Sequence, residues 1–289
     1  MDIQIDASLV KRLIARQFPH LGDLPVGPVA KQGWDNRTFR LGESLTVRLP
    51  VGPAYAAAVK KEAVALAALK PHLSVALPDV VALGEPTDDY PLPWSIRRWI
   101  EGETLESAGP EDRCAFAKRL GAVLVELRSA PAKMELIAGE HSFFRGCHPS
   151  VYGGGVVESL QILAGRVDVE RCFEIWQSGI TSAWAKEPVW FHGDVAAGNL
   201  LMSEGNLCAL IDFGTCGVGD PACDFAIAWT YFDAKERHVF REAINVDDGT
   251  WSRAKSWALW KALVSLAGLS SPDTNGFQAR ALREILSER

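Results

Sequence analysis

The pattern of apolar and polar residues changes about a third of the way along the chain. In the first part, short apolar runs alternate with turn residues, which is typical of strands. Two of these runs, Thr38 to Leu41 and Leu45 to Leu49, flank Gly42 and predict a hairpin. The same pattern predicts further strands at 80–83 and 94–100, and helical spacing of the apolar residues predicts helices at 3–18 and 54–69.

After Glu101 and Gly102 the apolar residues recur with a helical period. Pro110, followed by two acidic residues, predicts the start of a helix that continues through Phe116 and Leu120. Further helices are predicted at 156–164, 170–185, 221–232, 234–244, 251–267 and 277–287. We therefore expect an α+β fold of two lobes, with a small strand-rich lobe at 1–98, a hinge at 99–102 and a larger, mainly helical lobe at 103–289. Ligands favour the cleft between two such lobes.

Composition excludes several classes of function. The chain has 289 residues, of which 48% are hydrophobic and 23% charged, with a formal net charge of −6. No clustered basic segment indicates nucleic-acid binding, and no apolar run approaches the roughly 20 residues of a membrane-spanning helix. The residues from Met1 to Leu13 lack the pattern of a signal peptide, so we expect a cytoplasmic protein that binds neither nucleic acid nor membrane. Its oligomeric state is left open between monomer and dimer.

Other kinds of site are disfavoured by spacing. The six cysteines include no C-x-x-C pair, so buried free thiols are expected. His141, Cys147 and His148 match no zinc-binding spacing. The run from Gly153 to Gly155 lacks the strand and helix that flank a dinucleotide-binding loop, and the Walker-type phosphate loop is absent.

The strongest chemical signal is the segment from His192 to Asn199, followed by Asp212-Phe-Gly214. Asp194 and Asn199 have the spacing of a kinase catalytic loop, in which the Asp accepts a hydroxyl proton and the Asn binds magnesium. Asp212 then supplies a second magnesium ligand, because Mg²⁺ prefers hard oxygen atoms. Each motif alone would fit a turn, but the combination predicts phosphoryl transfer. His192 is expected to be a packing and hydrogen-bonding residue of the loop.

A basic residue and an acidic residue in the first part complete this pattern. Arg48 lies on the strand where protein kinases carry a phosphate-binding Lys, and Glu62 lies on the following helix. A guanidinium can bind phosphate and a carboxylate in bidentate fashion, so the replacement of Lys by Arg is chemically workable. The alternative is an exposed Arg on an edge strand. No glycine-rich loop precedes this strand, although the turn from Gly33 to Asn36 occupies its place.

The chain resembles the aminoglycoside phosphotransferase family, the small-molecule kinases that share a protein-kinase-like bilobal fold with choline and macrolide kinases. The resemblance covers essentially the whole length. It rests on the segments 33–36, 47–50, 191–201, 211–214 and 219–224. It implies a small antiparallel-sheet N-lobe and a larger helical C-lobe, a dependence on Mg²⁺, and ATP or GTP as the phosphoryl donor.

The resemblance also implies roles for individual residues. Asp194 becomes the catalytic residue, Asn199 and Asp212 the metal ligands, and Arg48 with Glu62 the phosphate-binding pair. The remaining implied contacts are with the nucleotide base: the adenine pocket floor at Leu201 and Ile211, and backbone groups near Trp99 and Ile100.

The acceptor is left open among several classes. An aminoglycoside-like compound is the nominal acceptor, a macrolide or a metabolite alcohol is the alternative, and antibiotic resistance rests on the resemblance alone. A catalytically idle nucleotide-binding scaffold is a further alternative, which the intact Asp194, Asn199 and Asp212 disfavour. A protein kinase is disfavoured because no long activation segment follows Gly214. Acidic residues that could bind a cationic acceptor are Glu158, Asp168, Asp233, Glu242, Asp247 and Asp248.

Overall fold

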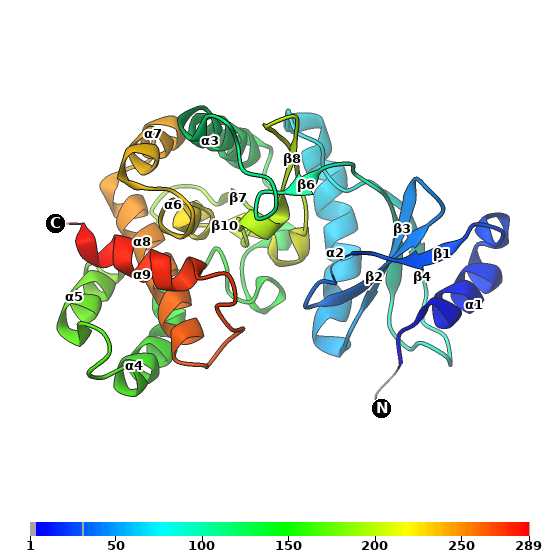
Figure 1. Ribbon diagram of the computed structural model, residues 1–289, viewed down its shortest axis with the longest axis horizontal. Coiled ribbons are helices and arrows are strands. Elements are labelled where there is room, and N and C mark those ends of the chain that lie inside the picture. The colour runs from blue at the N-terminus through cyan, green and yellow to red at the C-terminus, as the bar shows by residue number, and fades with distance from the viewer. Residues whose placement is uncertain (1–3, 31, 289) are drawn as a thin grey trace. The chain divides into compact units, whose positions relative to one another are not determined.

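A computed structural model describes residues 4–30 and 32–288, which form two compact units. The first unit contains the chain up to Pro71, then Ala76–Glu101 and Leu210–Gly214. The second contains His72–Val75, Gly102–Ala209 and the chain from Thr215 onward. An antiparallel sheet dominates the first and helices dominate the second (Figure 1), which confirms the predicted α+β class.

The sheet of the first unit has the strand order β1-β2-β3-β5-β4, with all neighbours antiparallel. The strands are β1 (Val26–Pro28), β2 (Asn36–Leu41), β3 (Leu45–Pro50), β4 (Val80–Gly84) and β5 (Trp94–Arg98). The predicted hairpin around Gly42 is confirmed, since β2 and β3 pair directly. Because side chains alternate along a strand, Val47 and Leu49 join one hydrophobic core, and Arg48 lies on the other face.

Two helices cover the sheet, α1 (Ala7–Gln17) and α2 (Pro53–Leu69), on opposite sides in Figure 1. The Asp6 carboxylate accepts a hydrogen bond from the N–H of Leu9 at 2.8 Å, so it caps α1. The helix predicted from Ile3 therefore begins later, and residue 3 itself lies outside the described residues. Apolar residues of α1 pack with β2, β3 and β5 in the core that contains Val47.

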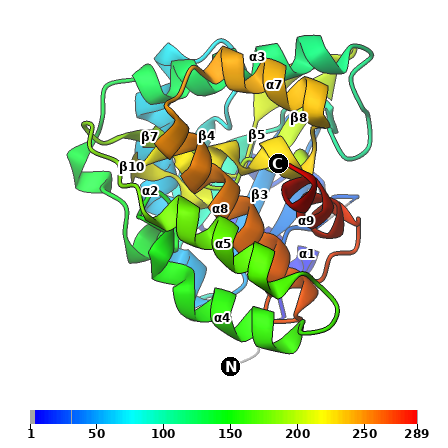
Figure 2. The same cartoon turned by 90° about the vertical axis from the view of Figure 1, so that its left-hand side faces the viewer.

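The second unit is built around the long helix α8 (Asp248–Leu266), which packs against α4 (Gly153–Ile162), α5 (Val169–Ile180) and α9 (Phe277–Ser287). The helices α3 (Arg113–Ser129) and α7 (Ala234–Ile244) lie side by side in both views (Figures 1 and 2). Among residues 4–30 and 32–288, no helix has the length and apolar composition needed to span a membrane.

Several other predicted helix boundaries differ from the structure. The helices expected at 156–164 and 251–267 each begin three residues earlier, at Gly153 and Asp248. The helix expected at Pro110 begins at Arg113, because the Asp112 carboxylate caps it through the N–H of Ala115. The helix expected at 170–185 ends at Ile180. The helix expected at 221–232 is a 3₁₀ turn at Pro221–Ala226 followed by the short helix α6 (Ile227–Thr230).

Short strands of the second unit frame the segments that carry the motifs. The strand β7 (Val189–Phe191) pairs with β10 (Gly217–Gly219), and β8 (Leu200–Ser203) lies between β6 (Glu103–Thr104) and β9 (Asn206–Leu210). The segment 192–199 is thus the connection from β7 to β8, and Asp212 lies two residues after the end of β9. The fold therefore holds both motifs at strand ends.

Candidate active site

The loop at 192–199 is fixed at its first two residues by hydrogen bonds. The buried carboxylate of Asp224 accepts from the backbone N–H groups of His192 at 2.8 Å and Gly193 at 2.7 Å. The Thr215 hydroxyl donates to the His192 carbonyl at 3.1 Å, and Arg145 Nε donates to the Gly193 carbonyl at 3.1 Å. All four backbone polar groups of these two residues are bonded, which holds the loop in one conformation.

Asp194 and Asn199 lie together on this loop. Gly193 has a φ of +86°, and a Cβ there would lie 2.7 Å from the Thr215 carbonyl oxygen, so only glycine fits. His192, 1% exposed, accepts the N–H of Asp194 on Nδ1 at 3.2 Å, which is the hydrogen-bonding role predicted for it. Asn199 Nδ2 donates to the carbonyl and to the carboxylate of the exposed Asp194, at 3.0 Å each. The amide oxygen of Asn199 is therefore turned away from Asp194.

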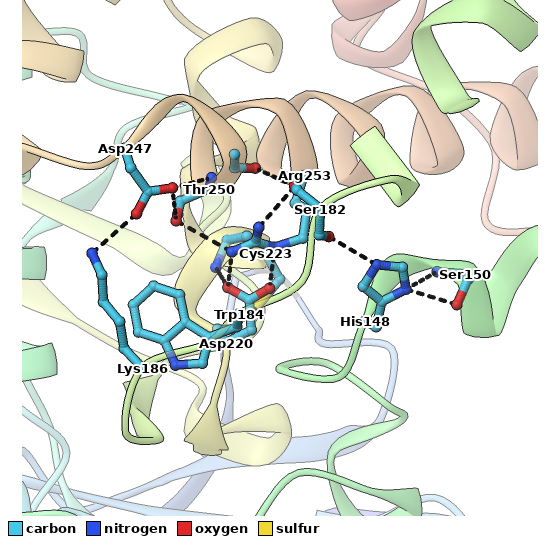
Figure 3. A network of polar contacts seen from close by, with 12 residues as sticks. His148, Ser150, Ser182, Trp184, Lys186, Asp220, Cys223, Asp247, Thr250 and Arg253 are labelled. Atoms are coloured by element: carbon cyan, nitrogen blue, oxygen red, sulfur yellow. Dashed lines mark hydrogen bonds and ion pairs between the residues drawn. The ribbon is translucent and has the colours of Figure 1, made fainter. Parts of the chain in front are cut away.

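A buried ion pair anchors the segment that carries Asp224 (Figure 3). Arg253 Nε donates to Asp220 Oδ2 at 2.6 Å, and its other nitrogens donate to Ser182 Oγ at 3.0 Å and Thr250 Oγ1 at 3.2 Å. Asp220 also caps the following 3₁₀ turn through the N–H of Ala222. Burial raises the pKa of Asp220, although the charge of Arg253 opposes this, and burial also raises the pKa of Asp224.

In the first unit, Arg48 contacts two carboxylates. Its Nη2 donates to Asp212 Oδ1 at 3.0 Å, and its Nη1 lies 3.6 Å from Glu62 Oε1. The bidentate partner of Glu62 is instead Arg97, whose two terminal nitrogens donate to Oε1 at 3.1 Å and Oε2 at 2.7 Å. Burial disfavours a charged Arg48, but Asp212 and Glu62 outweigh it and raise its pKa above the ordinary range. Arg48 is therefore a half-buried cation between two carboxylates, not an exposed edge-strand residue.

Asp212 has an uncommon backbone conformation. Its φ is +66°, a region that Asp tolerates better than most residues but that still costs energy. Two contacts within the first unit hold this turn: Arg48 binds the carboxylate, and Lys61 Nζ donates to the Gly214 carbonyl at 2.6 Å. Such strained conformations concentrate at functional sites, and the metal-binding role of Asp212 stays a prediction.

We expect the stability of the first unit to fall as the pH falls from 4.5 to 2. Burial alone would raise the pKa of Glu62, but the charges of Arg97 and Arg48 lower it from 4.5 to about 2. Because the folded-state pKa lies below the unfolded-state value, Glu62 stabilises the fold above pH 4.5, and this contribution disappears as the pH falls through 2. Melting temperatures across this range check the expectation.

The matched variants are Glu62→Gln and, for an exposed ion pair with Lys60, Glu85→Gln. Glu62→Gln is expected to melt lower at neutral pH and to show a flatter pH dependence, whereas Glu85→Gln keeps the wild-type profile. Equal pH profiles for wild type and Glu62→Gln would contradict this assignment.

A cavity of about 230 Å³ lies beside Asp194, wholly within the second unit. Its lining includes the cationic side chains of Arg145 and Lys261 and the rings of Trp257 and Trp260. None of the six acidic residues considered for a cationic acceptor lines it: Glu158, Asp168, Asp233, Glu242, Asp247 and Asp248. The Asp residues at 168, 233 and 247 instead cap α5, α7 and α8.

The residues implied for base binding are divided between the two units. Leu201, 6% exposed, lies on β8 in the second unit, and Ile211 lies half-buried in the first. Trp99 and Ile100 follow the end of β5. The Trp99 N–H already donates to the Ser44 carbonyl at 2.8 Å, so a nucleotide base would have to contact other backbone groups of this segment.

Thiols and histidines outside the loop form no apparent metal centre. The six cysteines are present as thiols and not as disulfides, with Cys172, Cys216 and Cys223 buried and the rest half-buried. The side chain of His148 contacts the Ser150 hydroxyl and the Ser182 carbonyl (Figure 3). Within the part of the chain that the structure describes, no group of three or more His, Cys, Asp or Glu side chains is arranged to hold a metal ion.

Several residues of the site were not predicted. Arg97 contacts Glu62, and Lys61 contacts the turn after Asp212. Nothing in the local sequence indicates either contact. Asp224 lies in the segment 219–224, which supported the family resemblance but was given no contact with the loop. Arg145, which binds the loop, lies in a segment without a regular pattern.

Kinase-like phosphotransferases place the same groups on the same elements, with a basic residue on the third strand, a Glu on the next helix and an Asp and Asn on a strand-flanked loop. The chain belongs to the phosphotransferase enzyme family, whose model matches residues 27–257. A search of curated protein sequences gives no match.

Solved structures of similar fold include antibiotic kinases. The GDP complex of aminoglycoside 2'-phosphotransferase-IIIa has a TM-score of 0.72 at 18% identity, covering 98% of this chain and 99% of that one. Macrolide 2'-phosphotransferase type I has a TM-score of 0.64 at 19% identity, with 100% of both chains covered. The macrolide 2'-phosphotransferase from Brachybacterium faecium has a TM-score of 0.60 at 19% identity, covering 98% and 99%. Identities this low establish the shared fold.

Proposed function

We propose that this protein transfers the γ-phosphate of ATP or GTP to a hydroxyl group of a small molecule, with the help of Mg²⁺. One observation carries the proposal: the exposed Asp194 carboxylate accepts a hydrogen bond from Asn199 on a loop whose first two residues, His192 and Gly193, have all their backbone polar groups bonded. A carboxylate held in this way can orient a substrate hydroxyl and accept its proton. In a loose phosphoryl-transfer transition state such positioning provides most of the catalysis.

The donor atoms of the two proposed ligands, taken one by one, suit a magnesium ion bound together with a nucleotide. Asn199 offers its amide oxygen, and Asp212 offers the carboxylate oxygen that Arg48 does not bind. Mg²⁺ usually binds one or two protein oxygens together with substrate phosphates, so two such ligands are sufficient. The ion would neutralise charge on the phosphates. Arg48, supported by Glu62, is the proposed phosphate-binding residue.

The nucleotide is proposed to bind through the positions that the family resemblance implies. The base would contact Leu201, Ile211 and backbone groups of the segment at Trp99 and Ile100. The choice between ATP and GTP stays open, since structures of similar fold carry ADP, GDP or ATP in their complexes. The hinge at 99–102 and the lobe limits at 98 and 103 stay predictions, as does the cytoplasmic location.

Among the acceptors considered, a metabolite alcohol fits the cavity better than an aminoglycoside-like compound. Proteins of similar fold bind gentamicin, streptomycin and kanamycin, which are candidates for a first screen. The cavity next to Asp194, however, is lined by Arg145 and Lys261 and by none of the acidic residues considered for a cation. The carboxylates that do line it are Asp194, Glu106 and Asp273. None of them forms an ion pair with Arg145 or Lys261, so these two cations would repel a polycationic acceptor.

A thermal-shift measurement with Mg²⁺ plus ATP or GTP tests the nucleotide site. A ligand bound only by the folded state stabilises it, by about 2.7 kcal/mol at 100 times its Kd. We expect a magnesium-dependent rise in melting temperature that Asp212→Asn abolishes and that the exposed control Asp88→Asn retains. No shift with either nucleotide at millimolar concentration would favour the idle scaffold. Release of nucleoside diphosphate across a panel of alcohols then identifies the acceptor.

A further inference from the structure

Several side chains that line the cavity beside Asp194 carry a buried polar atom without a hydrogen-bond partner. Within the described residues, Arg145 Nη1, Trp257 Nε1, Ser265 Oγ and Gln278 Oε1 are buried without a hydrogen-bond partner, and all four side chains line this cavity. A buried polar group left unpaired costs about 1–3 kcal/mol. Three of these four atoms can donate a hydrogen bond. A ligand with hydrogen-bond acceptors could therefore use these donors after a small movement of the side chains that now enclose them.

Arg145 is held rigidly with one end of its guanidinium unpaired. The guanidinium carbon lies 4.6 Å from the ring centre of Trp260, 5.2 Å from that of Trp257 and 5.7 Å from that of Tyr152. Its Nε binds the Gly193 carbonyl, and no carboxylate of the described residues forms an ion pair with it. Aromatic stacking and one backbone contact fix the orientation of this cation. A fixed, partly unpaired guanidinium is the usual partner of an oxyanion.

Lys261, on α8, brings a second positive charge to the same cavity. Its Nζ donates to the hydroxyls of Ser270 at 3.0 Å and Ser271 at 3.4 Å, and it likewise forms no ion pair among residues 4–30 and 32–288. Burial lowers the pKa of Lys261, the charge of Arg145 lowers it further, and Asp194 opposes the change. The two cations thus repel each other in the cavity, and an anion bound between them would relieve that repulsion.

Each of the three carboxylates that line the cavity has another contact or another proposed role. Asp273 accepts the N–H groups of Gln278 at 3.0 Å and Ala279 at 2.8 Å, at the start of α9. Glu106 lies against Gly198 of the loop, where an added Cβ would be 3.3 Å from its Oε1. Asp194 is the proposed catalytic group. None of these three neutralises Arg145 or Lys261 through an ion pair.

We propose that the acceptor is a small alcohol that carries an anionic group, either a carboxylate or a phosphate. Arg145 and Lys261 bind the anionic group, and the hydroxyl of the same molecule lies at Asp194. The cavity volume of about 230 Å³ suits such an acceptor, because pockets for drug-sized ligands are larger, roughly 300–1,000 Å³. This proposal names the acceptor class of the proposed kinase. It rests on that function, because a bound alcohol is an acceptor only if the protein transfers phosphate.

The test measures binding without nucleotide, so that it is independent of the donor site. Glycerate, glycerol 3-phosphate, glycerol and kanamycin are titrated into the full-length protein by calorimetry, with melting temperature as a second readout. The variants are Lys261→Met and the control Lys235→Met, which removes an equal charge from an exposed position on α7. Melting temperatures without ligand show that both variants fold.

We expect at least one of the two anions to bind and glycerol to bind much more weakly. Lys261→Met should weaken anion binding by about 10- to 100-fold, the effect of losing one hydrogen bond to a charged group, while Lys235→Met leaves it unchanged. The tighter anion identifies carboxylate or phosphate as the recognised group. The proposal is overturned if no anion binds, if glycerol binds equally well, if Lys261→Met has no effect, or if kanamycin binds most tightly.

This outcome separates the two proposals. If anion binding depends on Lys261 but Mg²⁺ with nucleotide does not raise the melting temperature, the anion site is supported and the kinase function is rejected. If nucleotide binds but no anion binds in a way that depends on Lys261, the kinase function is supported and the anion site is rejected.

Discussion

Replacing Asp194 with Asn is expected to lower kcat by about 10²- to 10⁴-fold, the usual contribution of a positioned proton acceptor. The Asn side chain keeps the size of Asp and can still accept a hydrogen bond from Asn199, so the loop should keep its conformation. It cannot take up the hydroxyl proton or draw the hydroxyl into line with the phosphate. The affinity for Mg²⁺ with nucleotide and the melting temperature should stay near the wild-type values.

The measurement is the rate of nucleoside diphosphate release with the acceptor that the screen identifies. Asn199→Ala is the informative comparison, because loss of a metal ligand should raise the magnesium concentration needed for half-maximal rate. If Asp194→Asn turned over the acceptor at close to the wild-type rate, the assignment of Asp194 as the proton acceptor would be wrong. If its nucleotide affinity fell in parallel with kcat, the change would have disturbed the loop as a whole.

Arg253→Met should lower the free energy of unfolding by about 3–5 kcal/mol, because removal of one partner leaves a buried charge without compensation. The side chains of Arg253 and Asp220 are 1% and 5% exposed. Arg253 also supplies hydrogen bonds to Ser182 and Thr250, whose hydroxyls would lose their partner. Chemical denaturation of the wild type and the variant measures the difference.

Two further variants make the result specific. Arg12→Met removes a cation whose ion pair with Asp89 is more than half exposed, and it should cost less than about 1 kcal/mol. Asp220→Asn combined with Arg253→Met removes the unpaired charge and should recover part of the loss. A cost for Arg253→Met no larger than that for Arg12→Met would show that the buried pair does not stabilise the segment at 220–224.

Local sequence patterns predicted most elements of the fold, and they predicted that Asp194 and Asn199 lie together on the segment 192–199. The hairpin at 36–50 and the helix α2 follow from periodicity within a single stretch of chain. The juxtaposition of Asp194 and Asn199 follows from their spacing on one loop, and the structure places them in hydrogen-bond contact. Helix starts were less accurate, because a cap such as Asp112 depends on one side chain and not on a repeating pattern.

The supporting residues depend on register between distant strands, which no local pattern encodes. On β5, Ser95 is paired with Arg48 and Arg97 with Thr46, so Arg97 lies on the same face of the sheet as Arg48 and contacts Glu62. A shift of one residue would have moved Arg97 to the opposite face. Asp224 likewise binds the loop at Gly193 only because the chain returns there after β10.

The first unit is assembled from separate stretches of the chain, and this affects its synthesis. Leu210–Gly214 belong to it by contact although more than a hundred residues of the second unit precede them. A nascent chain that has reached Glu101 carries the sheet, but Arg48 and Lys61 still lack Asp212 and the Gly214 carbonyl. Because domains fold as units during synthesis, the ribosome must extend the chain through most of the second unit before the first can be completed. Exchange of the sheet between relatives as one contiguous block would separate Arg48 from its own Asp212.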